Sequence, residues 1–315
     1  MKSSLRGSIC GIGAALSYGL NPLGALPLYE LGVNTNTMLF FRYGLAFVIL
    51  SIIMTMRRMD FKVSLHELMI LVPLGILFSL SSLTLFISFK YMGAGIACTL
   101  LFVYPVIVAI LMAIFFKERL TKITLLSMSM ALVGIWLLYD GKDGTKLNSF
   151  GILMVMASAL SYAIYIIVVN KSNVRMSSTK LTFYVLLFSA FVIIFFSVIG
   201  GKSNHIIMLT TGGMWIHAIV LAVFPTVVSL LLMVIAIHDI GSTPTAIMGA
   251  LEPVTAVIIG VTLFGEALSS RLMLGMVLIL VAVILIIIGK ALSAEMIMNV
   301  IGKFGHVLVK HWRWK

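Results

Sequence analysis

The chain has 315 residues, of which 61% are hydrophobic and only 10% are charged. Soluble domains are roughly half apolar and about a quarter charged, so this composition excludes an ordinary water-soluble fold. The net charge of +12 comes from Lys and Arg residues spread over short connections and the C-terminal end, which excludes a concentrated nucleic-acid-binding surface.

Ten apolar stretches follow one another along the chain. Each has about twenty residues, the length that a helix needs to cross roughly 30 Å of hydrocarbon. We predict transmembrane helices over residues 8–28, 36–56, 67–89, 93–115, 120–139, 150–170, 181–199, 214–236, 242–264 and 270–290. The predicted fold class is therefore an all-α polytopic membrane protein with ten transmembrane helices.

The first stretch resembles the start of a signal peptide, because Lys2 and Arg6 precede an apolar run. The run continues to Leu28, however, and its Ala15-Leu16-Ser17-Tyr18 recurs as Ala159-Leu160-Ser161-Tyr162. We therefore interpret it as a retained helix.

The distribution of Lys and Arg predicts the orientation in the membrane. With the N-terminus in the cytoplasm, sixteen of the 22 Lys and Arg residues fall in cytoplasmic segments, five fall in outer loops, and Arg42 lies within a helix. We predict a multi-pass protein of the cell membrane, of the bacterial inner-membrane type, with both termini in the cytoplasm.

An internal repeat divides the chain. Residues 93–138 align with residues 241–286 without a gap, and twelve of the 46 positions are identical, including Gly93 with Gly241 and Pro105 with Pro253. Each half, residues 1–140 and residues 150–290, then has five helices. Because five is odd, the second half enters the membrane from the opposite side, and the repeats are inverted.

Three stretches of this sequence resemble the drug/metabolite transporter superfamily, specifically its EamA family. They are Phe89-Lys90-Tyr91-Met92-Gly93-Ala94-Gly95, Tyr104-Pro105-Val106 leading to Lys117-Glu118-Arg119-Leu120, and Leu251-Glu252-Pro253-Val254 leading to Gly265-Glu266-Ala267-Leu268. The resemblance implies ten helices, cytoplasmic termini and transport of small solutes, frequently the export of amino acids or other metabolites.

Glu252 is the leading candidate for a transport site. It lies about ten residues into its predicted helix and so close to the bilayer midplane, where an ionised carboxylate is costly. We predict that it binds a proton or a cation in a central cavity, beside a helix distorted by Pro253. The alternative is a buried carboxyl group that only joins helices.

Five further residues are candidates for the same cavity. Arg42 either faces the cavity or extends along its aliphatic stem to the outer headgroups. Tyr104 aligns with Glu252 and precedes Pro105, the helix-breaking partner of Pro253, while Tyr18 aligns with Tyr162. These tyrosines and His217 are predicted solute contacts, with core packing as the alternative.

Glu118 and Glu266 are a repeated pair that we interpret as structural. Each precedes a predicted helix, and a carboxylate is favoured at the positive end of the helix dipole. The six His and two Cys residues are scattered, so we expect no metal site, no cofactor and no catalytic cluster.

The C-terminal segment, residues 295–315, is predicted to be a helix lying on the cytoplasmic face of the membrane. Ile297, Val300, Ile301, Phe304 and Leu308 form an apolar face, and Lys303, His306, Lys310 and Arg313 form a basic one that suits anionic headgroups. The alternative is a disordered basic tail.

Taken as a whole, the sequence predicts an alternating-access carrier of a small-molecule substrate. A channel and, less favoured, an integral-membrane enzyme are the alternatives.

Overall fold

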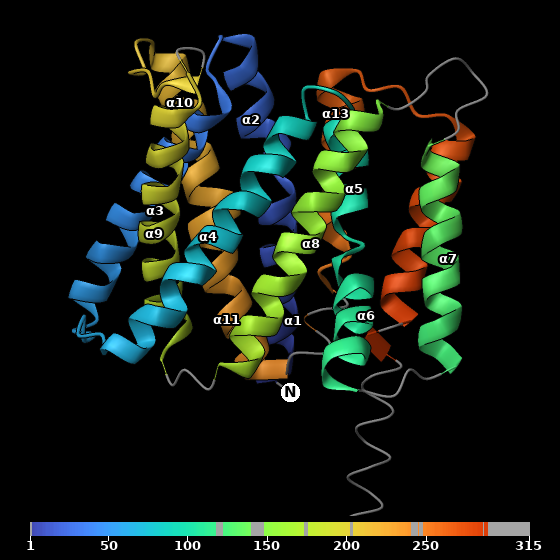
Figure 1. Cartoon of the computed structure of the whole chain (residues 1–315), viewed down its shortest axis with the longest axis horizontal. Helices are drawn as coiled ribbons and strands as arrows, with labels where there is room; N and C mark the ends of the chain where they lie inside the picture. Colours follow the sequence, from blue (N-terminus) through green and yellow to red (C-terminus); the bar gives the residue numbers. More distant parts are fainter. Residues whose placement is uncertain are drawn as a thin grey trace, which may run out of the picture.

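The computed structural model describes residues 2–117, 122–139, 148–172, 176–201, 204–240, 245, 248–285, 287 and 288. These residues form helices and connections without strands, and Figure 1 shows the helices running side by side between two ends of the molecule. Seven helical segments are long and apolar enough to cross a membrane, and three shorter apolar helices accompany them. The all-α membrane class is thus confirmed for the described residues.

Most helix bounds lie within a few residues of the predicted spans, but in the span 242–264 the described helix α13 begins only at Leu251. The first half contains α1 (Lys2–Gly19), α2 (Asn21–Glu30), α3 (Thr35–Met56), α4 (Leu65–Ser88), α5 (Ala94–Leu101), α6 (Tyr104–Phe116) and α7 (Lys122–Tyr139). The second half contains α8 (Ser149–Lys171), α9 (Ser178–Ile199), α10 (Gly212–Ala222), the π-helix η2 (Val223–Val228), α11 (Ser229–Ile240), α13 (Leu251–Phe264) and a last helix, Ser270–Leu285. Glu118 and the C-terminal segment lie outside the described residues.

Polar side chains set where several of these helices begin. The first amides of a helix have no partner within the helix, so a side-chain oxygen just before it is stabilising. Asn34 accepts a hydrogen bond of 2.8 Å from the Thr37 amide at the start of α3, and Ser64 forms a reciprocal pair with Glu67 at the start of α4. Asn148, Ser177 and Thr211 accept the corresponding bonds at α8, α9 and α10.

Prolines mark breaks inside the membrane-crossing segments. The first segment breaks at Leu20 before Pro22, the fourth breaks at Phe102 before Pro105, and the eighth contains the π-helical turn around Pro225. Proline has no amide hydrogen and disrupts the regular helical bonding, which explains the positions of these breaks. Pro253 lies in the first turn of α13, and residues at or next to each of these interruptions line one cavity.

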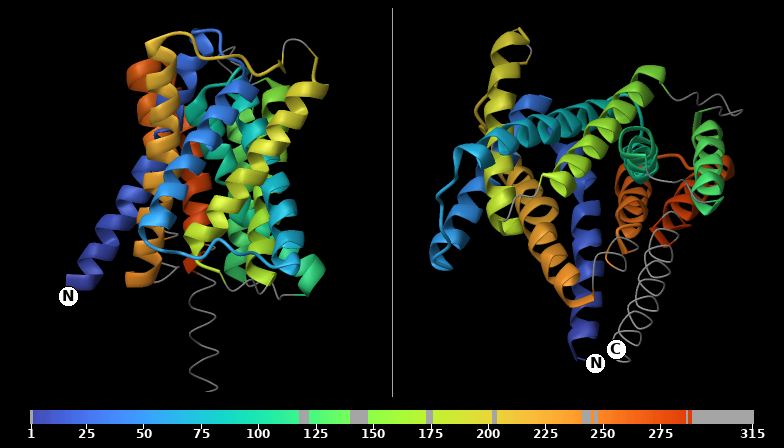
Figure 2. Two further views of the ribbon diagram at one scale, coloured as in Figure 1. Left: turned by 90° about the vertical axis from the view of Figure 1, so that its left-hand side faces the viewer. Right: turned by 60° about the horizontal axis from the view of Figure 1, so that its bottom comes forward.

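The helix pairs that pack together follow the internal repeat: a pair formed by one segment of each half has a counterpart formed by the equivalent segments of the opposite halves. α1 packs along α11, and α8, which is the counterpart of α1 in the second half, packs along α4, the counterpart of α10 and α11. Two further pairs, α3 with α9 and α5 with α13, each join equivalent segments of the two halves, and α9 also packs against α4. Both additional views show this interleaving of segments from the two halves (Figure 2).

Close approach of backbones holds the halves together. A Cβ atom added to Gly95 on α5 would lie 2.8 Å from the Cα atom of Val257 on α13. Small residues allow such contacts between membrane helices, where there is little hydrophobic force between them. Large apolar side chains such as Phe115, which is 73% exposed, cover the outside of the bundle and face the lipid.

Candidate functional site

A small cavity lies in the middle of the bundle, where segments of both halves meet. Its volume is about 80 Å³. Of the residues predicted from the sequence, Tyr18, Tyr104, Tyr162, Glu252 and Pro253 line it. The fold therefore brings together side chains from α1, α6, α8 and α13 that are as much as 235 residues apart.

Glu252 enters this cavity from the first turn of α13. Its carboxylate makes no hydrogen bond or ion pair with any described residue. The backbone beside it is tightly packed, because a Cβ atom on Gly19 of α1 would lie 2.7 Å from the Glu252 carbonyl oxygen. The position of the helix is thus fixed, whereas the bonding capacity of the carboxylate is open to a proton, water or a solute.

Tyrosine rings form one wall of the cavity. The rings of Tyr104 and Tyr162 lie 4.8 Å apart between centroids and almost perpendicular, and Tyr162 stacks on Tyr165 at 5.8 Å. Tyr165 in turn contacts Phe78 of α4, with centroids 5.7 Å apart. This edge-to-face and stacked packing gives a firm aromatic surface beside the cavity.

Arg42 lies beside the cavity and does not line it. Only 2% of the residue is exposed, its Nε atom donates to the Thr226 hydroxyl at 2.9 Å, and its guanidinium carbon lies 5.3 Å from the centroid of the Phe86 ring. The guanidinium also interacts with the Tyr18 hydroxyl. Arg42 therefore does not extend to the headgroups, and the π-helical turn that carries Thr226 holds it inside the bundle.

His217 is not brought to this cavity. It lies half-buried on α10, where its carbonyl oxygen is close to Gly24 of α2.

The structure adds lining residues that the sequence analysis passed over, chiefly Asn21 and Ser229. Asn21 is the first residue of α2, and its Nδ2 atom donates to the Tyr18 carbonyl oxygen at 2.8 Å. Ser229 donates to the Ala14 carbonyl oxygen at 2.9 Å. A polar residue next to Pro22 inside an apolar run was the available sequence signal for Asn21.

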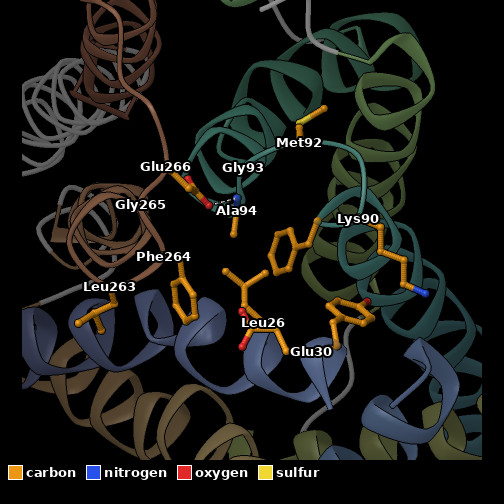
Figure 3. A pocket seen from close by; sticks show the side chains of 12 residues that line it. Leu26, Glu30, Lys90, Met92, Gly93, Ala94, Leu263, Phe264, Gly265 and Glu266 are labelled. Carbon is orange, nitrogen blue, oxygen red and sulfur yellow. Dashed lines mark hydrogen bonds between the residues drawn. The ribbon is translucent and has the colours of Figure 1, made fainter. Parts of the chain in front are cut away.

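A second, wider pocket of about 480 Å³ opens at the end of the bundle where α2 ends and α5 begins. Figure 3 shows Glu266 and Lys90 on opposite sides of it. The Lys90 ammonium group lies 4.8 Å from the centroid of the Tyr29 ring, an arrangement that a cation and an aromatic face favour.

Glu266 caps a different helix from the one that its sequence position indicated. Its carboxylate accepts hydrogen bonds from the amides of Ala94 at 2.6 Å and Gly95 at 3.2 Å, at the start of α5 in the other half. The helix that follows Glu266 is capped instead by Ser269, which accepts from the Leu272 amide at 3.3 Å. Burial raises the pKa of the Glu266 carboxyl group above its usual value, while the two amides act in the opposite direction.

The two pockets differ in what they can hold. Small-molecule sites commonly have volumes of roughly 300–1,000 Å³, a range that includes the outer pocket and excludes the central cavity. The structure is therefore open at the end that carries Glu266 and constricted at its centre. In the described part of the chain, no group of three or more His, Cys, Asp or Glu residues is placed to hold a metal ion.

Comparison with known proteins gives related transporters. An uncharacterized transporter of Archaeoglobus fulgidus is 30% identical over 192 residues, which are 61% of this chain and 66% of that protein. An uncharacterized transporter of Synechocystis is 26% identical over 216 residues, which are 67% of this chain and 64% of that protein. The alignments thus span just under two thirds of the length of both relatives.

A solved structure, described only as "Crystal structure of protein", has a TM-score of 0.65 at 15% identity, covering 92% of this chain and 98% of that chain. This likeness concerns the fold alone. The family model described as "EamA-like transporter family" matches residues 5–140 and again residues 149–288. The chain, a multi-pass membrane protein, therefore belongs to the EamA-like transporter family.

Proposed function

We propose that this protein is an alternating-access carrier that exports small metabolites, such as amino acids, through two inverted five-helix repeats. The inverted arrangement is supported by the direction of equivalent segments. Glu266, just after the end of α13, bonds to Ala94 at the start of α5, so these two equivalent segments run antiparallel. At the other end of the bundle, Arg6 near the start of α1 pairs with Asp239 near the end of α11 at 2.6 Å.

The observation that carries the proposal is the unpartnered Glu252 carboxylate in a cavity shared by both halves. A carrier needs a central group whose surroundings differ between its two open states, and inverted repeats place the site at their interface. An ionisable side chain inside a membrane protein is costly and marks a transport pathway by default. Glu252 is thus the proposed proton-binding or cation-binding group.

The membrane placement follows from the distribution of charge. We propose a cell-membrane protein of the bacterial inner-membrane type with both termini in the cytoplasm, because most Lys and Arg residues fall on that side. The wider pocket then opens to the outside. The C-terminal segment would contact anionic headgroups.

Reconstitution into sealed liposomes tests the carrier mechanism. A panel of amino acids and toxic analogues is first screened by growth of a deletion strain and an overexpressing strain, which identifies solutes and the direction of transport. A carrier shows saturation and counterflow of the solute, whereas a channel shows neither. Chemical conversion of the solute inside the liposomes would instead indicate an enzyme.

Glu252→Gln tests the assigned group, because it keeps the size of the side chain and removes its charge. Transport should fall at least about tenfold or lose its dependence on pH, as expected for loss of one essential charged interaction. Asp60→Asn is the matched control, since Asp60 is exposed in the connection after α3. Transport by Glu252→Gln at the original rate with the original pH profile would make Glu252 a structural residue.

A further inference from the structure

We infer that the transported solute carries an ammonium group and that Asn21 binds this group together with Glu252 in the central cavity. The inference rests on the carrier function proposed above and names the chemical class of its solute. It also gives Asn21, a residue at the break between α1 and α2, a role in recognition.

The hydrogen bonds of Asn21 fix the orientation of its side-chain amide. Nδ2 must be the atom that faces the Tyr18 carbonyl oxygen, since it donates there at 2.8 Å and an oxygen would be repelled. The other atom, Oδ1, is then fixed as an acceptor. It is buried without any hydrogen-bond partner, and only 2% of the residue is exposed. An unpaired buried acceptor destabilises a protein. A donor supplied by a solute would complete the missing hydrogen bond and remove this penalty.

Glu252 supplies a second acceptor in the same cavity. Its carboxylate also lacks a protein donor, and Arg42 makes no ion pair with it. Two acceptors without protein donors, one of them carrying a negative charge when ionised, select a solute group with several N–H donors and a positive charge. An ammonium group has both properties, whereas a hydroxyl group has one donor and no charge, and a carboxylate has no donor and is repelled.

The remaining walls suit the same group. The rings of Tyr104 and Tyr162 line the cavity, and aromatic rings attract ammonium groups electrostatically through their faces. The volume of about 80 Å³ admits a head group of this size, since a water molecule occupies about 30 Å³ in the liquid. The rest of the solute needs space that opens only when the helices around the cavity move.

Matched pairs of small molecules test the inference on the full-length protein in lipid nanodiscs. Each pair has the same carbon skeleton and exchanges an amino group for a hydroxyl group: L-leucine with L-leucic acid, L-phenylalanine with L-phenyllactic acid, and isoamylamine with isoamyl alcohol. Thermal protection of the protein is measured against concentration. The amine of at least one pair should protect at a concentration at least about tenfold lower than its hydroxyl partner, the difference expected for hydrogen bonds to a charged group.

Two substitutions separate recognition by Asn21 from its structural role at the helix break. Asn21→Ala removes the acceptor and the bond to Tyr18, whereas Asn21→Asp keeps an acceptor, exchanges the donor of that bond for a second oxygen and adds a negative charge. The half-saturating amine concentration should rise about tenfold in Asn21→Ala and stay at or below the wild-type value in Asn21→Asp. Tyr43→Phe is the control, because it removes a fully buried polar oxygen from a residue that does not line the cavity.

The outcomes distinguish this inference from the carrier proposal. Equal protection by both members of every pair, absence of protection by every amine, or the same loss of amine binding in Asn21→Ala and Asn21→Asp would overturn the ammonium site. Amine-specific protection with the expected variant pattern, but no counterflow in liposomes, would uphold the site and overturn the carrier. Counterflow of a solute that has no amino group would overturn the inference and leave the carrier in place.

Discussion

Replacing Glu252 by Gln removes a negative charge from the middle of the bundle and keeps the size of the side chain. The structure predicts that this change stabilises the protein. In most buried ion pairs, loss of one partner leaves an uncompensated charge, but Glu252 has no partner among the described residues, so no bond is lost. An acidic or basic residue at the centre of a membrane helix costs about 2.5–3.5 kcal/mol on insertion scales, and an amide costs less.

A gain of about 1–2 kcal/mol is therefore expected, because part of the penalty is already relieved by the polar walls of the cavity. This corresponds to a rise of roughly 2–6 °C in the apparent melting temperature. Only the ionised carboxylate carries the full penalty, so the gain should be larger at pH 9 than at pH 5. A group that is unfavourable for stability and required for transport is the expected compromise at a functional site.

Fluorescence-detected thermal unfolding in nanodiscs measures this effect, with Asp60→Asn as the control for general loss of negative charge. The reasoning would be refuted if Glu252→Gln melted below the wild type at both pH values. That result would mean that the carboxylate makes a stabilising bond, and Glu252 would then be a structural link between helices.

Three further predictions concern the topology, the outer contact between the halves and the C-terminal segment. In a background without native cysteines, single cysteines at positions 119 and 267 should react from opposite sides of the membrane, and labelling of both from the cytoplasm would exclude inverted repeats. Because burial raises the pKa of Glu266 above 4.5, the folded state takes up a proton more readily than the unfolded state. Thermal stability should decline as the pH rises from about 4.5 through that raised pKa, and Glu266→Gln should lack the decline. A peptide of residues 295–315 should become helical on anionic vesicles by circular dichroism and remain unordered on neutral ones. Equal signals on both would remove the proposed headgroup contact.

The sequence predicted the helices better than their interruptions. A transmembrane segment is recognisable from length and hydrophobicity alone, so α4 was expected over 67–89; it is found over 65–88, directly after the Ser64 cap. The break at Phe102 and the π-helical turn at Pro225 depend on how neighbouring helices accept the freed backbone groups. Such an arrangement is a property of the assembled bundle, and a proline alone does not specify it.

The predicted residues at aligned positions of the two halves lie together, whereas His217 lies apart from them. Glu252 was selected for its depth in the membrane, Tyr104 because it aligns with Glu252, and Tyr18 and Tyr162 because they align with each other; all four line the cavity where the halves meet. His217, which was also predicted to contact the solute, lies on α10 and does not line the cavity. Asn21 escaped notice because its significance comes from an unpartnered oxygen, which only the folded arrangement reveals.

The two halves have similar backbones but different side chains at the cavity, and both features bear on how a carrier would work. If the two open states exchange the conformations of two similar backbones, these states have similar energies, and modest binding energy suffices to shift the population between them. The side chains do not share this symmetry, because Tyr104 occupies in the first half the position that Glu252 occupies in the second. The only carboxylate among the cavity-lining residues described is thus attached to one half and moves with it. Its surroundings must then differ between the two states, and this difference allows a proton or an ammonium group to be bound from one side and released to the other.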